Sequence, residues 1–278
     1  MPTDLSRRVL QVMRAAGESE LMPRFGNLQQ SDIREKKPGD LVTVADLAAE
    51  RRITAGLNEI LPGVPVVGEE AVAADPALQD RIRTAERAWI VDPLDGTSNF
   101  AKGRAMFAII VALVERGEPI GGWIHDPIKG RNASVEKGLG TWLDGARVGY
   151  GNGGDPKQME GFVGFGFRRL VLEKMRPGSL DRIGPITSLN CAGQEYLDIM
   201  AGNRQFNLYR QIKPWDHAAG VLMVQEAGGY AARFDDTPYT PTSQDGGLLS
   251  APDRATWQKL HDIMVGDSLA EINAFPKR

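Results

Sequence analysis

The chain has 278 residues, of which 42% are hydrophobic and 25% are charged, and its formal net charge is −3. These fractions are typical of globular proteins, so the composition excludes a disordered chain, a collagen-like fibre and a coiled coil. A mildly acidic chain also lacks the basic footprint of most proteins that bind nucleic acid or anionic membranes, and we expect neither partner.

The cysteine content and the N-terminal sequence indicate the compartment. A single cysteine, Cys191, excludes an internal disulfide and the cysteine-based metal sites. Charged residues interrupt every apolar run near the N-terminus, so this segment does not resemble a signal peptide. The longest apolar run, residues 106–114, is too short to span a bilayer. We therefore expect a protein of the reducing cytoplasm.

The first half of the chain mixes helical and extended patterns. Apolar residues recur at helical spacing over 5–17 and over 45–61, where Pro62 and Gly63 end the second helix. The polar stretch between these helices, residues 24–40, is predicted to be a mobile loop. Runs rich in β-branched residues predict strands over 64–67, 89–91, 106–114 and 120–124.

The second half alternates strands and helices more regularly. Residues 147–161 are rich in glycine and polar side chains and are predicted to separate two lobes. The N-terminal lobe, 1–150, is predicted to be α+β, and the C-terminal lobe, 151–278, to be α/β. The predicted elements beyond the boundary are strands over 162–167, 206–210 and 230–234 and helices over 194–201, 215–227 and 252–265.

Four short segments place acidic residues where an apolar strand or helix meets a turn. They are Asp40–Asp46 (DLVTVAD), Gly68–Glu70 (GEE), Trp89–Thr97 (WIVDPLDGT) and Trp215–Gly220 (WDHAAG). In the third segment, Pro93 interrupts regular strand pairing, and Asp95, Gly96 and Thr97 form a turn whose amides can point at one spot. Because the nearby acids would repel a bare phosphate, such a turn suits a phosphate that is bound together with metal cations.

The residue types also predict which metal is bound. The acids offer only oxygen ligands, which favours a hard cation such as Mg²⁺ over Zn²⁺. The three histidines lie far apart in the sequence and form no histidine-based metal motif. Two cations that share Asp92 as a ligand would stabilise both the attacking and the leaving oxygen of a phosphate ester. These residues therefore predict metal-assisted hydrolysis of a phosphate ester.

Taken in order, the four segments resemble the motifs of the inositol monophosphatase family. The likeness continues in residues 136–145 (EKGLGTWLDG) and 226–229 (EAGG), and it runs from about Pro38 to the final helix. The resemblance implies a layered αβαβα sandwich with the active site between the lobes. It also implies a small phosphorylated substrate, a homodimer and inhibition by lithium.

The resemblance implies a role for each site residue as well. Two to three Mg²⁺ ions per site would be held by Glu69, Asp92, the Leu94 carbonyl, Asp95 and Asp216. Thr97 and Asp46 would orient and deprotonate the attacking water, and Glu69 would assist through the third, weaker cation. The expected attack is direct and in line, without a phosphoenzyme.

The same family pattern places the substrate. Asp95, Asp216 and the backbone amides of Gly96 and Thr97 would bind it, with the two amides on the phosphate oxygens. On the side of the substrate's alcohol, residues 190–195 (NCAGQE) replace a Gly-Ser/Thr-Ala-Ala segment, and Tyr209 replaces an acid. Inositol 1-phosphate is the predicted substrate, while fructose 1,6-bisphosphate, histidinol phosphate and 3′-phosphoadenosine 5′-phosphate stay open.

Two other functions are weighed against this prediction. A phosphatase with an aspartyl nucleophile needs Asp-x-Asp, whereas this chain has Asp92 and Asp95 three residues apart. A catalytically silent regulator that binds metal or phosphate stays open, although none of the expected ligands is missing from the sequence.

Several residues near the motifs also have ordinary structural explanations. Glu70 is expected to stay on the surface, and Lys36 and Lys37 to form a solvated charge pair rather than to attract phosphate. Cys191 is expected to be a buried thiol rather than a nucleophile, and His217 to pack inside its helix. Asp216 is expected to cap its helix as well as to bind a cation.

Overall fold

The computed structural model describes residues 2–164, 172–174, 176–243 and 245–274. The longer helices are α1 (Asp4–Ala16), α2 (Val44–Ile60), α7 (Ala192–Met200), α8 (Pro214–Glu226) and α9 (Arg254–Met264), and α10 (Leu269–Ala274) follows α9. Three short helices in the N-terminal half are α3 (Glu69–Ala74), α4 (Arg81–Thr84) and α5 (Thr97–Ala101).

Two larger sheets and one hairpin contain the strands. The seven-stranded sheet follows chain order, with β3 (Val66–Gly68), β4 (Arg87–Asp95), β5 (Ala108–Glu115), β6 (Glu118–His125), β7 (Asn132–Glu136), β8 (Gly140–Leu143) and β9 (Ala146–Val148). The five-stranded sheet has the order β11 (Ile186–Thr187), β10 (Gly161–Val163), β12 (Phe206–Tyr209), β14 (Leu248–Ala251) and β13 (Tyr230–Ala232). Separately, β1 (Ile33–Lys37) and β2 (Asp40–Thr43) form an antiparallel hairpin.

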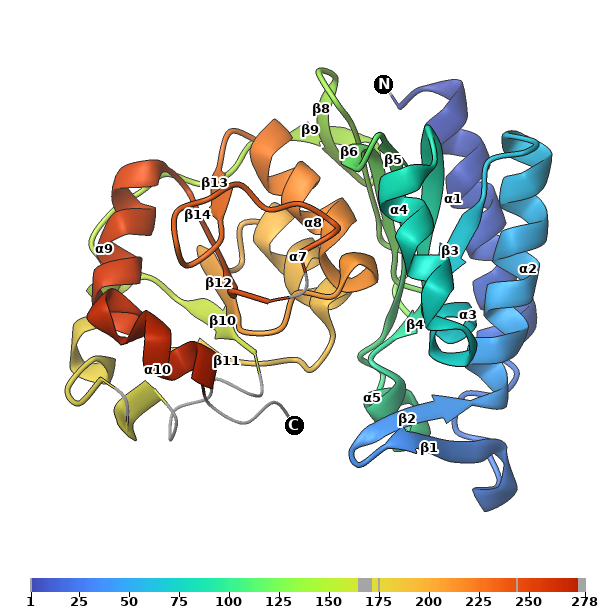
Figure 1. The fold of residues 1–278 in the computed structure, drawn as a ribbon, viewed down its shortest axis with the longest axis horizontal. Helices are drawn as coiled ribbons and strands as arrows, with labels where there is room; N and C mark the ends of the chain where they lie inside the picture. The colour runs from blue at the N-terminus through green and yellow to red at the C-terminus, as the bar shows by residue number, and fades with distance from the viewer. Residues whose placement is uncertain (1, 165–171, 175, 244, 275–278) are drawn as a thin grey trace.

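Helices and sheets alternate in five layers across the molecule (Figure 1). The pair α1 and α2 covers one face of the seven-stranded sheet, and the pair α7 and α8 lies between the two sheets. On the far side of the five-stranded sheet lie α9 and α10. The predicted αβαβα sandwich is confirmed.

The strand β5 shows why this layering suits the sequence. Ile109 and Val111 pack against α1 and α2, whereas Ile110 and Ala112 face α8 on the opposite side. A strand buried on both faces has an almost continuous apolar sequence, because no face is left for polar residues. The apolar run that predicted this strand is therefore explained by its place in the middle of the stack.

Most predicted elements are present, and one region was interpreted wrongly. Residues 24–40, predicted as a mobile loop, include all of β1 and the start of β2, which pair with each other. The predicted strand over 162–167 is a strand at Gly161–Val163, and its last three residues lie outside the described residues. The lobe boundary at 147–161 stays a prediction.

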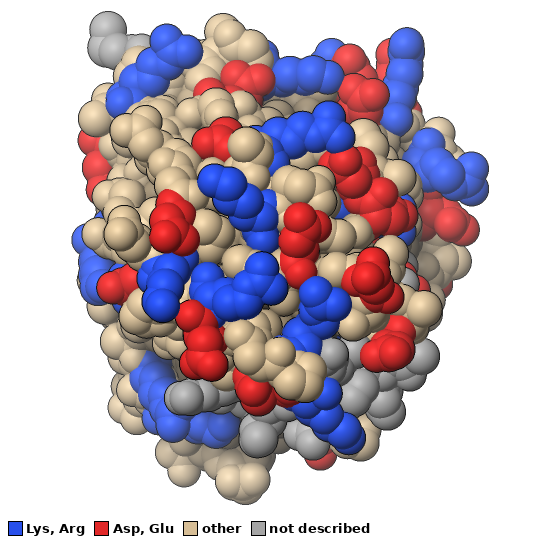
Figure 2. Space-filling view, turned by 90° about the vertical axis from the view of Figure 1, so that its left-hand side faces the viewer, with Lys and Arg blue, Asp and Glu red and all other residues tan. Residues whose placement is uncertain are grey.

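Two surface properties bear on possible partners. Among the described residues, no helix has both the length and the apolar character needed to cross a membrane. Figure 2 shows the face around α9 and α10, where basic and acidic residues are interspersed over the described part of the surface. This face does not gather charge of one sign.

Candidate active site

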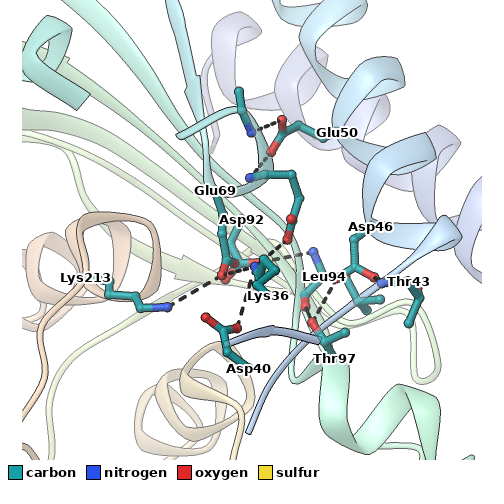
Figure 3. Close-up of polar contacts among 12 residues, drawn as sticks. Lys36, Asp40, Thr43, Asp46, Glu50, Glu69, Asp92, Leu94, Thr97 and Lys213 are labelled. Atoms are coloured by element: carbon teal, nitrogen blue, oxygen red, sulfur yellow. Dashed lines mark hydrogen bonds and ion pairs between the residues drawn. The ribbon is translucent and has the colours of Figure 1, made fainter. Parts of the chain in front are cut away.

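The structure brings the predicted acidic residues together from three elements, and Figure 3 shows two of these acids, Glu69 and Asp92. Glu69 is the first residue of α3, directly after β3, and Asp92 and Asp95 lie at the end of β4. Asp216 lies in the first turn of α8, close enough to Asp92 for the two charges to influence each other. Pairing of β4 with β5 shifts register between Asp92 and Asp95, as Pro93 predicted.

These acids crowd negative charge into a buried place. Burial, followed by the charges of Glu69, Asp95 and Asp216, raises the pKa of Asp92 well above its ordinary value. Burial likewise raises the pKa of Asp216 to about 8 and that of Asp95 to about 6. Carboxyl groups that raise one another's pKa in this way need a positive partner to be ionised together near neutral pH.

Two lysines approach the same acids. Lys36 Nζ on β1 lies 3.0 Å from Glu69 Oε1, 2.9 Å from Glu70 Oε1 and 3.7 Å from Asp40 Oδ1. Lys213 Nζ lies 3.6 Å from the same Glu69 oxygen. The lysines thus supply cationic partners for Glu69 from both sides of the site (Figure 3).

This arrangement overturns two sequence-based expectations. Glu70 was expected on the surface, but it is 6% exposed because its carboxylate turns inward to Lys36. Lys36 was expected to be solvated, but its side chain is 14% exposed and is held by the acids. Formation of the β1–β2 hairpin accounts for both differences, since it carries Lys36 over Glu69 and Glu70.

Thr97 and Asp46, the predicted dyad, are in contact. Thr97 Oγ1 donates a hydrogen bond to Asp46 Oδ1 at 2.8 Å and also lies 2.9 Å from the Leu94 carbonyl. The other carboxylate oxygen of Asp46 accepts from the Thr43 amide at 2.8 Å, which forms a capping box at the start of α2. Burial raises the pKa of Asp46 to about 6. Asp46 is therefore fixed by α2 and presents one oxygen to Thr97.

The turn between Asp95 and Thr97 requires its glycine. Gly96 has a φ of 89°, in the left-handed region, and a Cβ at this position would lie 2.9 Å from the Met106 carbonyl oxygen. No other residue type fits without displacing the backbone. The turn leads directly into α5, which begins at Thr97.

Three further expectations can be compared with the structure. Cys191 is 3% exposed, and burial raises the pKa of its thiol, so the buried-thiol interpretation is confirmed. His217 is 2% exposed, and burial lowers its pKa to about 3, in keeping with a packing role. The expectation that Asp216 caps α8 is wrong, because Lys213 occupies the N-cap position and Pro214 begins the helix.

Sequence reasoning missed the roles of Glu50 and Lys213. Glu50 accepts hydrogen bonds from the amides of Glu70 and Ala71 and so holds the start of α3. It follows Asp46 by four residues on α2, so helical spacing could have placed it on the same face. Lys213 directly precedes the Pro-Trp-Asp motif, so its place in the sequence could have indicated that it lies near the site.

The donor chemistry fits a hard divalent cation. The buried acids offer oxygen ligands only, and their negative charge exceeds what the nearby lysines neutralise. In the described part of the chain, however, no three such side chains are already arranged as a cation site. Both lysines contact Oε1 of Glu69, so a cation at this carboxylate would share it with them or displace them.

Without metal, the thermal stability of the protein is expected to fall as the pH rises from 5 to 8. The pKa of Asp216 is raised from 3.8 to about 8, so the folded state keeps a proton that the unfolded chain has lost. The resulting stabilisation is complete below pH 3.8 and disappears as the pH passes 8. Differential scanning fluorimetry in a chelator should show a decrease on the order of 5 °C, and excess Mg²⁺ should reverse it. A midpoint that does not change with pH would contradict this electrostatic picture.

Known proteins of one family are similar to this chain both in sequence and in structure. The model of the family described as "Inositol monophosphatase family" matches residues 7–266. A fructose-1,6-bisphosphatase/inositol-1-monophosphatase of Thermotoga maritima is 32% identical, over 77% of this chain and 79% of its own length. The Nus factor SuhB of Pseudomonas aeruginosa is 31% identical, over 81% and 83% respectively. An IMPase structure from Thermotoga maritima superimposes with a TM-score of 0.81 at 26% identity, covering 97% of this chain and 100% of that one.

Proposed function

Because the chain belongs to the inositol monophosphatase family and is a phosphatase, we propose that it hydrolyses inositol 1-phosphate to inositol and phosphate with Mg²⁺. The observation that carries this proposal is the hydrogen bond from Thr97 to Asp46 beside the cluster of Glu69, Asp92, Asp95 and Asp216. The family resemblance further supports a cytoplasmic homodimer that lithium inhibits, with the lobes 1–150 and 151–278 on either side of the site.

The acid cluster supplies the proposed cation ligands. Two to three Mg²⁺ ions would be held by Glu69, Asp92, the Leu94 carbonyl, Asp95 and Asp216. When bound, Mg²⁺ lowers the pKa of water and offsets the charge of the phosphate. Lys36 and Lys213, which pair with Glu69 in this structure, would then be free to face the substrate instead.

The residues Thr97 and Asp46 carry the proposed proton transfer. A threonine hydroxyl is too weak an acid to act alone, but it can pass a proton to a carboxylate that it already contacts. Asp46 accepts from Thr97 and is held by the capping box, so its second oxygen cannot turn away. The attacking water would be oriented by Thr97, and Asp46 would hold the proton.

The substrate would lie over the turn after β4. The amides of Gly96 and Thr97 would donate to the phosphate oxygens, and Asp95 and Asp216 would contact the substrate from the cation side. The name of the Thermotoga maritima relative includes both fructose-1,6-bisphosphatase and inositol-1-monophosphatase, so fructose 1,6-bisphosphate is the main alternative substrate.

A panel of substrates tests the proposal. With Mg²⁺, release of phosphate from inositol 1-phosphate should have the highest kcat/KM among inositol 1-phosphate, fructose 1,6-bisphosphate, histidinol phosphate and 3′-phosphoadenosine 5′-phosphate. The chelator EDTA should stop release from all four, because the acids alone repel phosphate. A clear preference for another member of the panel would replace inositol 1-phosphate as the substrate and leave the phosphatase assignment in place.

A second candidate function is regulation without catalysis. One relative is named a Nus factor, so at least one protein similar to this chain is not named for a phosphatase activity. In this chain, however, each proposed ligand is present, and Thr97 still contacts Asp46. Absence of phosphate release from every substrate of the panel, in a folded protein that binds Mg²⁺, would favour the regulatory function.

A further inference from the structure

A buried carboxylate, Glu195, lies behind the active site in the first turn of α7. Its side chain is among the most buried of the charged residues, at 1% exposure, and burial raises its pKa to about 7. Among the described residues, three donors reach it, and all are uncharged. Burying a carboxyl group without a cationic partner is costly, so its hydrogen bonds indicate what it holds in place.

Glu195 holds the turn formed by residues 188–191. Its Oε1 accepts hydrogen bonds from the Leu189 amide at 2.8 Å and from the Ser188 hydroxyl at 3.1 Å. Its Oε2 accepts from the hydroxyl of Tyr209 on β12. The turn includes Asn190, whose φ of 52° lies in the left-handed region, where residues other than glycine are uncommon. Asparagine tolerates this region better than most residues, and the hydrogen bonds to Glu195 add to the stability of the turn.

Asn99 holds the same turn from the opposite side. Its Nδ2 lies 2.8 Å from the Leu189 carbonyl oxygen, 3.3 Å from that of Asn190 and 2.8 Å from that of Met106. Because Asn99 follows Thr97 by two residues on α5, the turn is tied to the proposed catalytic segment as well as to α7.

The last residue of the turn, Cys191, and the nearby Gly193 reach Asp95. Cys191 Sγ and the Gly193 amide both donate to Asp95 Oδ2, at 3.1 Å and 2.6 Å. Within the described residues, no donor is bonded to Oδ1 of the same carboxylate. The two donors thus fix the rotation of the Asp95 carboxylate and leave one oxygen available.

We propose that Glu195 is a positioning residue of the active site. It sets the 188–191 turn, the turn places the donors of Cys191 and Gly193, and these donors orient Asp95 so that Oδ1 is available to a cation. The inference rests on the proposed function, because it treats Asp95 as a cation ligand. Hydrogen bonds that orient a metal ligand from behind are known to contribute strongly to metal affinity.

Calorimetric titration of the full chain with Mg²⁺, in the absence of substrate, tests this role. Glu195→Ala is expected to weaken Mg²⁺ binding at least about tenfold, because the turn loses its two anchors at Ser188 and Leu189. Glu195→Gln keeps an acceptor for both anchors and should bind Mg²⁺ within about threefold of wild type. In kinetic assays, Glu195→Ala should need a higher Mg²⁺ concentration to reach half its maximal rate than Glu195→Gln does. The kcat of Glu195→Ala at saturating Mg²⁺ should change less than this Mg²⁺ requirement.

Two further variants separate positioning from general loss of stability. Tyr209→Phe removes one hydroxyl from Glu195 and should weaken Mg²⁺ binding even if Glu195→Ala fails to fold. Thr141→Val removes another buried hydrogen bond, from Thr141 Oγ1 to the Met223 carbonyl at 2.7 Å, and should lower the melting temperature without changing Mg²⁺ affinity.

Two results would overturn the proposal. One is wild-type Mg²⁺ affinity in Glu195→Ala or, if that variant does not fold, in Tyr209→Phe. The other is binding by Glu195→Gln as weak as that of Glu195→Ala, which would assign the effect to charge instead of to position. If the wild-type protein itself bound no Mg²⁺, the proposed function would fail first, so the two failures are distinguishable.

Discussion

Replacement of Asp95 by asparagine is expected to lower Mg²⁺-dependent phosphate release about a thousandfold, which corresponds to about 4 kcal/mol of transition-state stabilisation. Asparagine keeps the size of the side chain and an acceptor for the Gly193 amide, so the fold should persist. Burial raises the pKa of Asp95 to about 6, which means that its charge is unfavourable without a cation. The metal-free variant should therefore be at least as stable as the wild type.

The measurements for Asp95→Asn are phosphate release under saturating Mg²⁺ and the melting temperature in a chelator. Asp253→Asn provides a matched control, since Asp253 caps α9 far from the site and asparagine is an equally good N-cap. The control should keep full activity. Wild-type phosphate release by Asp95→Asn would contradict the proposed cation site.

Replacement of Thr97 by alanine is expected to lower kcat about a thousandfold, because the attacking water loses the hydroxyl that links it to Asp46. Mg²⁺ affinity should change little, since the Thr97 side chain is not among the proposed ligands. The variant also removes a group that donates within the site, so crystal or spectroscopic checks of folding should accompany the kinetics. Thr97→Ser keeps the hydroxyl and should retain most of the activity.

The pH dependence of the wild type offers an independent check of the same dyad. Burial raises the pKa of Asp46 to about 6, and only the ionised form accepts a proton. Activity should therefore fall as the pH decreases through about 6, provided that Mg²⁺ stays saturating.

If Thr97→Ala kept the rate of the wild type, the proton would have another acceptor and the dyad would be ruled out.

Strands that are stabilised by burial could be predicted from the sequence, whereas strands that are stabilised mainly by pairing could not. Burial on both faces made the sequence of β5 apolar and therefore easy to recognise. The strand β1, with the sequence IREKK, has no such pattern, because pairing with β2 stabilises it while most of its side chains face solvent. The strands β7 to β9, at one end of the seven-stranded sheet, were missed because they are short and separated by turns that contain Gly138 and Gly145.

In the site, the sequence predicted the proposed catalytic and metal-binding residues, but it did not predict the residues that hold them in place from elsewhere in the chain. The positions of Asp46 and Thr97 followed from motifs whose order in the chain is distinctive, and the structure places their side chains in contact. The pairing of Lys36 with Glu69 joins residues 33 positions apart through a hairpin that the sequence did not predict. Glu195 was likewise invisible, because its role depends on the packing of α7 against the 188–191 turn.

The central position of α7 and α8 has a consequence for attempts to divide the molecule. Residues of the seven-stranded sheet, such as Ile110, and of the five-stranded sheet, such as Leu248, belong to one hydrophobic cluster with these helices. A cut between β9 and β10 separates the sheets in sequence and would expose this common core on both fragments. We therefore expect the chain to unfold as a single cooperative unit, in which Asp92 and Asp216 meet only when both fragments are present.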